Sequence, residues 1–172
     1  MTAERWIIME EKIYTLLNEQ VNKEFQSAYV YLDFYNFFEE KSLDGFSKWY
    51  KDQANEEISH AWRFINYLHD MDQQVKLTPI EHKSQKYSSV KEVLEGGLHH
   101  EQYISGCIRD IYSQANETKD FETMNFLNYF LSEQIEEEVN ARNLIAKYDF
   151  VGESGVLGMN GILQNSSDHQ AQ

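Results

Sequence analysis

The sequence contains few of the residues that interrupt helices or cross-link a chain. One proline and 8 glycines in 172 residues leave long tracts without a helix breaker, which favours an all-α protein. The one cysteine has no partner for a disulfide within the chain. No stretch approaches the roughly 20 apolar residues of a membrane-spanning helix, and the apolar run near the first residue is too short for a secretion signal. We therefore expect a protein of the cytoplasm.

Basic residues are also scarce. The 15 Lys and Arg residues are outnumbered by 29 Asp and Glu residues, which gives a formal net charge of -14. This charge repels the phosphates of nucleic acids and the surface of anionic membranes, whereas it attracts cations. We therefore expect no nucleic acid and no membrane as a partner, and we consider metal ions as ligands.

Apolar residues recur every three or four positions along four long tracts, as they do on one face of a helix. The tracts cover about residues 9–41, 46–71, 89–116 and 121–148. Asp44 and Gly45 are predicted to form the turn before the second tract, and Ser89 is predicted to cap the third. Residues 156–163 predict a short fifth helix, and residues 164–172 are expected to form a polar tail.

The connections between the four tracts are short, long and short. Residues 74–88 hold the single proline, Pro79, and show no helical period. At up to ~3.3 Å per residue, this segment can span roughly 50 Å, the length of a helical bundle. We therefore predict a four-helix bundle that runs up, down, down, up, with a long crossover between its second and third helices. Residues 1–150 would form the bundle, and residues 151–172 the short helix and the tail.

Several acidic residues fall on the apolar stripes, where a helix normally places core side chains. Each tract has at least one, and the second tract adds a histidine. The residues are Glu24, Glu57, His60, Glu101, Glu133 and Glu137. An isolated ionised carboxylate inside a core costs several kcal/mol. A group of them therefore needs a shared partner.

These residues lie at similar heights in the predicted bundle. Glu24 and Glu57 lie 17 and 12 residues from the first turn, and Glu101 and Glu133 lie 15 and 13 residues from the second. The members of each pair therefore differ in height by about one helical turn, and one pocket can collect ligands from all four helices. Oxygen ligands with one imidazole and no thiolate suit two iron or manganese ions better than a structural zinc.

A metal-free alternative uses the same residues differently. In that interpretation the chain is a helical bundle for binding or scaffolding, and its internal acids pair with lysines and arginines. Few basic residues share the apolar stripes, which disfavours this interpretation.

Four segments resemble those of bacterial non-haem ferritin, over roughly residues 11–150. The segments are "LNEQVNKEFQSAYVY", "NEEISH", "HHEQ" and "NFLNYFLSEQIEEE". The resemblance implies a first iron site at Glu24, Glu57, His60 and Glu101. It implies a second at Glu57, Glu101 and Glu137, with Gln134 nearby. Glu57 and Glu101 would bridge the two irons.

The same resemblance implies residues around this pair of irons. A third iron site would be formed by Glu56, Glu133, Glu136 and again Glu137. Tyr31, two helical turns beyond Glu24 on the same face, would stand beside the centre. The five histidines other than His60 are expected to be structural or at the surface.

The function implied by the resemblance is iron storage. The protein would bind two Fe(II), oxidise them with O2 or peroxide as a ferroxidase, and store Fe(III) as a mineral in a shell of 24 identical subunits. The alternatives are a di-iron oxidase or peroxide-detoxifying protein without storage, and the metal-free interaction protein described above.

The sequence departs from related families at four positions. Haem-binding bacterioferritins have a methionine where this chain has Ile58, and a second Glu-x-x-His where it has Glu136. We therefore expect no haem. Animal ferritins place acids at their three-fold pore where this chain has Met124 and Leu127, so the same route for iron uptake is not implied.

Overall fold

The computed structural model describes residues 9–168, and these residues form helices and connecting segments without a strand. The helices are α1 (Glu11–Glu40), α2 (Asp44–Asp70), α3 (Val90–Thr118), α4 (Phe121–Val151) and α5 (Val156–Asp168), with a 3-10 turn, η1 (Glu153–Gly155), before α5. The predicted all-α class is confirmed. Within the described part of the chain, no helix has the length and apolar character needed to cross a membrane.

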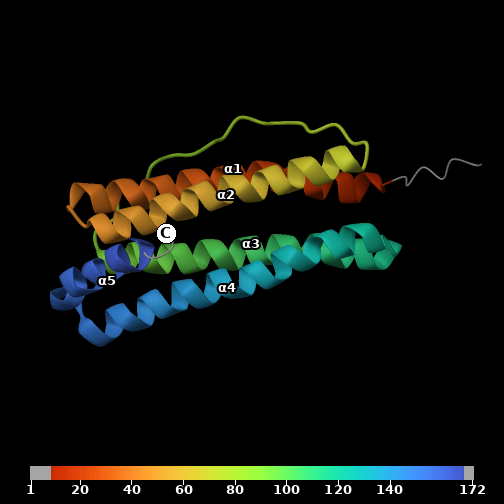
Figure 1. The fold of residues 1–172 in the computed structure, drawn as a ribbon. Coiled ribbons are helices and arrows are strands. Elements are labelled where there is room, and N and C mark those ends of the chain that lie inside the picture. Colours follow the sequence, from red (N-terminus) through yellow and green to blue (C-terminus); the bar gives the residue numbers. More distant parts are fainter. Residues whose placement is uncertain (1–8, 169–172) are drawn as a thin grey trace, which may run out of the picture.

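The four long helices form two antiparallel pairs, α1 with α2 and α3 with α4 (Figure 1). After α2 the chain returns along the outside of the first pair, so that α3 runs parallel to α2 (Figure 1). This is the predicted up, down, down, up bundle with its long crossover. Asparagine side chains of α1 hold the crossover. Asn18 donates a hydrogen bond to Lys76 O at 2.9 Å and accepts one from Lys76 N at 2.7 Å, and Asn22 accepts one from Thr78 N at 2.8 Å.

The starts of α3 and α4 are capped by side chains that directly precede these helices. The hydroxyl of Ser89 accepts a hydrogen bond from Glu92 N at 3.2 Å, and the Glu92 carboxylate accepts from Ser88 N at 2.7 Å. The predicted cap at Ser89 is therefore confirmed. Asp120 caps α4 in the same manner, accepting from Thr123 N at 2.9 Å. These bonds satisfy amide groups that have no partner within the helix.

The predicted turn at Asp44 and Gly45 is wrong, because both residues belong to α2. The turn lies just before them, and Ser42 adopts the left-handed backbone conformation there, with φ at 56°. Gly45 serves packing instead. A Cβ atom at this position would lie 2.0 Å from the carbonyl oxygen of Asn160, so only glycine lets α5 approach α2.

The fifth helix is longer than predicted, and it ends at Asp168 rather than at residue 163. Its glycines do not end it, because Val156, Met159 and Leu163 bury their side chains in the same hydrophobic cluster as α1 and α2. The predicted polar tail is thus helical up to Asp168, and its last four residues lie outside the described part. The predicted division of the chain at residue 150 stays a prediction.

Two hydrophobic clusters fill the bundle, one toward each end. The first includes Tyr31, Phe38, Phe46 and Tyr50 together with α5. The second surrounds Phe64 and the opposite ends of the helices. Along every long helix, the residues between the two clusters include buried polar side chains. The core is therefore interrupted by one polar layer, at the height predicted for the ligands.

The contact between α5 and α2 generates a stability prediction. The Asn160 side chain accepts a hydrogen bond from Gly45 N at 2.8 Å and caps α2, which has no cap of its own. Asn160→Ala should therefore lower the free energy of unfolding by about 1 kcal/mol. Gly45→Ala should cost more, roughly 1–3 kcal/mol, because the added methyl group meets backbone atoms.

Urea unfolding followed by circular dichroism measures both effects. Gly158→Ala, in the same helix as Asn160, is the matched control, because its Cβ would enter open space. A Gly45→Ala variant as stable as the control would show that α5 does not need this close approach.

Candidate metal centre

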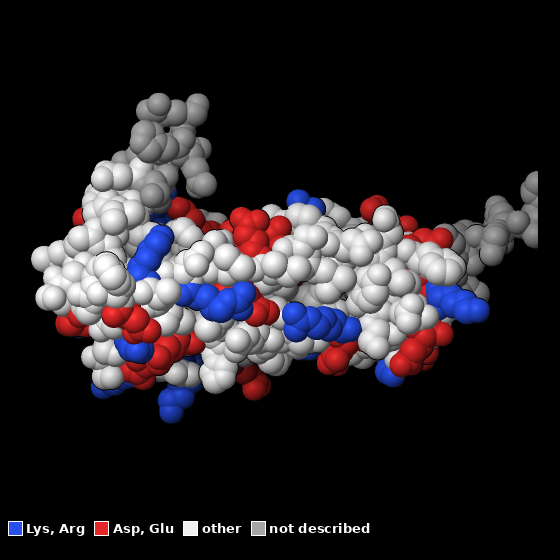
Figure 2. Space-filling model, turned by 90° about the horizontal axis from the view of Figure 1, so that it is seen from below, with Lys and Arg blue, Asp and Glu red and all other residues white. Residues whose placement is uncertain are grey.

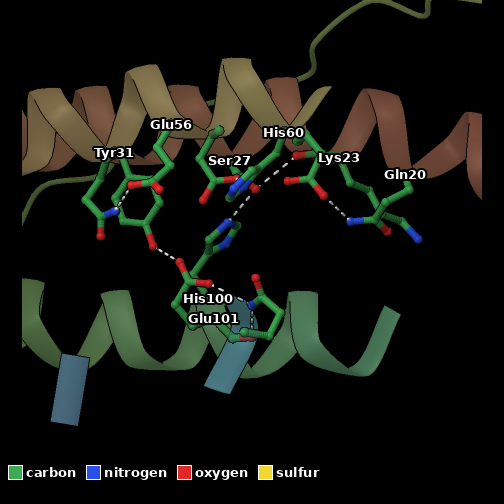
Figure 3. A network of polar contacts seen from close by, with 12 residues as sticks. Gln20, Lys23, Ser27, Tyr31, Glu56, His60, His100 and Glu101 are labelled. Carbon is green, nitrogen blue, oxygen red and sulfur yellow. Dashed lines mark hydrogen bonds and ion pairs between the residues drawn. The ribbon is translucent and has the colours of Figure 1, made fainter. Parts of the chain in front are cut away.

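The polar layer contains predicted ligands from all four long helices. Figure 3 shows Glu56 and His60 on one side of this layer and Glu101 on the other. The side chains of Glu24, Glu57, His60, Glu101, Gln134 and Glu137 are all buried, with exposed fractions between 1% and 6%. No lysine or arginine is buried among residues 9–168. The acids of the layer therefore have no buried cation of the protein as a partner, contrary to what a metal-free bundle would require.

Three of these residues form a compact group. One ligand atom each from Glu24, Glu57 and His60 lie within 4.8 Å of one another. Glu24 Oε2, Glu57 Oε2 and His60 Nε2 are buried and have no hydrogen-bond partner, although His60 Nδ1 lies 3.6 Å from Glu57 Oε2. Buried polar atoms without partners are rare in proteins. A metal cation would engage all three of them.

Glu101 is oriented by side chains from two other helices. Tyr31 in α1 donates a hydrogen bond from its hydroxyl to Glu101 Oε1. Gln134 in α4 donates to Glu101 Oε2 at 2.9 Å. Each carboxylate oxygen can accept a second interaction. Glu101 is therefore held in place without using up its capacity to bind a metal.

A second group of ligand atoms lies at the edge of the layer. It consists of Glu56, His60 and Glu133, again within 4.8 Å of one another, and both glutamates are half-buried. The sequence predicted Glu56 and Glu133 together with Glu136 and Glu137. The structure places His60 with the first two. The exposed Glu136 and the buried Glu101 and Glu137 belong to neither group.

Burial changes the protonation of the acids. It raises the pKa of Glu57 and of Glu101 to about 7 each, and that of Glu137 to about 9. Neighbouring carboxylates contribute to these raised pKa values, whereas the hydrogen bond from Gln134 opposes the shift of Glu101. The pKa of Glu24 is also well above its ordinary value, first because of burial and then because of Glu57. A metal ion acts in the opposite direction, since it binds the ionised form and displaces the protons.

Sequence reasoning gave no role in the layer to two residues that support it. His100 is half-buried, its Nε2 lies 2.8 Å from Ser27 Oγ, and burial lowers its pKa to about 4. Ser27 already donates to Lys23 O, so it accepts from the imidazole and ties α1 to α3. Gln20 donates to Glu24 Oε1 at 2.8 Å. The sequence contained a signal for Gln20, because this polar residue lies on an apolar stripe one helical turn before Glu24.

Comparison with known proteins identifies the family. The model of the ferritin-like domain family matches residues 14–151. The chain is 36% identical over 148 residues to the bacterial non-haem ferritin of Campylobacter jejuni. The aligned region covers 86% of this chain and 89% of that protein. It is 35% identical over 131 residues to the bacterial non-haem ferritin of Staphylococcus saprophyticus, with coverage of 76% and 78%.

A solved structure supports the same assignment. The open-pore ferritin of the hyperthermophilic archaeon Archaeoglobus fulgidus matches with a TM-score of 0.88 and 32% sequence identity, over 91% of this chain and 96% of that one. The similarity therefore extends over the whole bundle that builds the polar layer. The fold, the family match and the curated relatives agree, and the chain belongs to the ferritin family.

Proposed function

We propose that this protein stores iron and oxidises Fe(II) at the buried layer before storing it. Iron storage is the function that membership of the ferritin family supports. Two observations on Glu24, Glu57 and His60 carry the proposal for the oxidation site: each residue has a buried ligand atom without a hydrogen-bond partner, and ligand atoms of the three residues lie within 4.8 Å of one another. An oxygen-rich set with one imidazole suits Fe(II).

Two Fe(II) ions bind as substrate in this proposal. Glu24, Glu57, His60 and Glu101 hold the first ion, and Glu57, Glu101 and Glu137 hold the second, with Gln134 nearby. Glu57 and Glu101 bridge the ions. Support for this role of Glu101 comes from its position, because Tyr31 and Gln134 orient its carboxylate and leave coordination capacity on both oxygens.

The oxidation step balances with O2 as the oxidant. Each of two Fe(II) ions loses one electron, and O2 takes both electrons and two protons to give hydrogen peroxide and two Fe(III). Holding the two ions close together lets one O2 molecule receive both electrons. Peroxide is an alternative oxidant for the same site.

The edge of the layer would pass iron onward. Glu56, Glu133, Glu136 and Glu137 form the proposed third site. The proximity of Glu56 and Glu133 to His60 supports a path that begins at the first site. Tyr31 would stand beside the reacting ions, because its hydroxyl donates directly to Glu101.

Storage requires a closed shell, and we propose a homo-24-mer located in the cytoplasm. Large apolar side chains on the outside of the single chain support self-association, since Phe150 is 91% exposed and Leu157 is 75% exposed. On the face seen in Figure 2, acidic and basic side chains are interspersed, and wide uncharged areas lie between them. The exposed apolar side chains of Phe150 and Leu157 are suited to contacts between subunits.

Substituting the proposed bridges tests the oxidation site. Glu57→Ala and Glu101→Ala should each slow the initial oxidation at two Fe(II) per subunit by at least roughly 100-fold, which is the upper range for residues that only orient a ligand. Glu136→Ala should stay close to the parent rate, because Glu136 is exposed, whereas Glu57 and Glu101 are buried in the layer. Stopped-flow absorbance at aerobic mixing measures the rates. Parent-like oxidation by both bridge variants would place the reaction elsewhere.

The pKa values predict how the metal-free protein responds to pH. The pKa of Glu101 is raised to about 7 and that of Glu137 to about 9, so the folded chain keeps protons that the unfolded chain loses above about 4.5. The folded state therefore loses stability as the pH rises above about 4.5, by up to about 1.4 kcal/mol per pH unit for each group. The contribution of Glu101 is complete near pH 7, and that of Glu137 near pH 9.

Urea unfolding of the metal-free protein across this pH range measures the slope. Glu137→Gln should flatten it, because this variant cannot ionise at that position. Glu136→Gln is the matched control, since it removes an exposed carboxylate one residue away. An identical slope in the parent and in Glu137→Gln would contradict the assignment.

The mass in solution tests the shell. Native mass spectrometry should find a particle of 24 copies of the 20.4 kDa chain. The exposed apolar side chains would then be covered by neighbouring subunits. A stable monomer or dimer would instead favour a di-iron oxidase or a peroxide-detoxifying protein without storage.

A further inference from the structure

A small cavity adjoins the buried layer on the side that faces α5. Its volume is about 10 Å³, which is close to the space that one water-sized molecule occupies. Its wall includes Tyr31, Tyr50, Gly97, Glu101, Glu137 and Ala141, so all four long helices contribute. Glu101 and Glu137 belong both to this wall and to the proposed iron site.

The cavity reaches from this site toward the surface of the bundle. Trp49, Gln53 and Ala141 line it and are half-buried, whereas Gly97 and Glu101 are buried. The half-buried residues come from α2 and α4, so the outer side of the cavity lies between these two helices. A small molecule that passes between them arrives at the carboxylates of the centre.

Most of the wall is made of carbon. The rings of Tyr31 and Tyr50 stack with their centroids 5.9 Å apart, and Leu144 and Trp49 add further apolar surface. Two of the polar groups are engaged, because Tyr31 donates to Glu101 and Gln53 donates to Glu56 at 3.2 Å. The remaining polar groups of the wall include the Tyr50 hydroxyl and the carboxylates of Glu101 and Glu137. In the proposed complex these two carboxylates bind iron, so the aromatic and aliphatic remainder of the wall offers few of the roughly 2–4 polar partners that a buried water needs and suits an uncharged, apolar molecule.

We propose that this cavity is the pocket through which O2 reaches the two iron ions. The inference depends on the proposed ferroxidase function, since O2 is the small apolar reactant of that reaction. Cations would enter by a different route, at the edge of the layer. The half-buried carboxylates of Glu56 and Glu133 lie beside His60 there and attract positive charge. The two substrates would thus use separate routes, one acidic and one apolar.

Gly97 keeps the pocket open. An added Cβ would lie 3.6 Å from the Tyr50 hydroxyl and 3.9 Å from the Phe34 ring, which is ordinary contact without a clash. The methyl group of Gly97→Ala would therefore occupy the cavity while the neighbours stay in place. Glycine inside a helix is less stable than alanine by roughly 0.5–1 kcal/mol, so we expect the variant to fold at least as well as the parent.

The test compares Gly97→Ala with Gly106→Ala in the assembled protein. Gly106 lies in the same helix, and its Cβ would enter open space. Initial oxidation rates are measured at several O2 concentrations, and Fe(II) binding is measured by calorimetry without O2. In Gly97→Ala the KM for O2 should rise about tenfold, which is the lower end of the range expected when one methyl group is added to a tight pocket. Fe(II) binding should not change, and Gly106→Ala should behave as the parent does.

A second substitution blocks the outer side of the pocket. Ala141→Leu enlarges the side chain at a half-buried position of α4. The longer side chain therefore has room, and the bundle should still form. It should also raise the KM for O2 and leave Fe(II) binding unchanged.

Two results would overturn the O2 pocket. One is an unchanged dependence on O2 in both Gly97→Ala and Ala141→Leu, which would assign the cavity to water or to the passage of Fe(III). The other is a parallel loss of Fe(II) binding, which would show that Gly97 only shapes the metal site. A parent protein that consumes no O2 when Fe(II) is added would contradict the ferroxidase proposal itself, and this outcome is recognisable before any variant is made.

Discussion

Repulsion between like charges in the middle of the bundle is the constraint on which the rest of the structure depends. Glu24, Glu57, Glu101 and Glu137 are buried in one layer, and no lysine or arginine is buried with them in the described part of the chain. Without a metal, the layer lowers this cost by keeping protons, as the raised pKa values indicate. The hydrophobic clusters on either side hold the helices together across a layer that contributes little stability itself. Binding cations replaces the protons and turns repulsion into attraction.

Much of the fold was predictable because it depends on local chemistry. Helix periodicity, the cap at Ser89 and the segment without periodicity around Pro79 are properties of neighbouring residues, and the structure agrees with each. The errors occurred where a distant contact decides. Gly45 has the sequence signature of a turn, yet it is a helical residue whose missing side chain admits α5. The glycines of α5 disfavour a helix locally, and burial of Val156, Met159 and Leu163 against the bundle overrides that preference.

The buried polar layer was predictable to the level of helix faces. A buried acid on an apolar stripe contradicts the ordinary pattern so strongly that Glu24, Glu57, His60 and Glu101 could be selected without a structure, and all four are buried. What the pattern does not contain is the direction of each side chain. Glu56 and Glu133 therefore meet His60 rather than Glu136. His100 follows a second histidine in the sequence, and only the packing of α1 against α3 directs it to Ser27.

The rigidity of the layer comes from aromatic packing rather than from ion pairs. Tyr31 stacks on Tyr50 at 5.9 Å, and Tyr50 stacks on Phe38 at 5.4 Å, which links Glu101 to the hydrophobic cluster beneath α5. Such rings have few rotatable bonds and fill space densely, so they fix the Tyr31 hydroxyl against Glu101 at little entropic cost. The same stacked rings form the carbon wall of the cavity beside the site. In the proposed site, one group of side chains would thus orient a ligand for the metal and limit which molecules approach it from that side, whereas the acidic edge of the layer would favour cations.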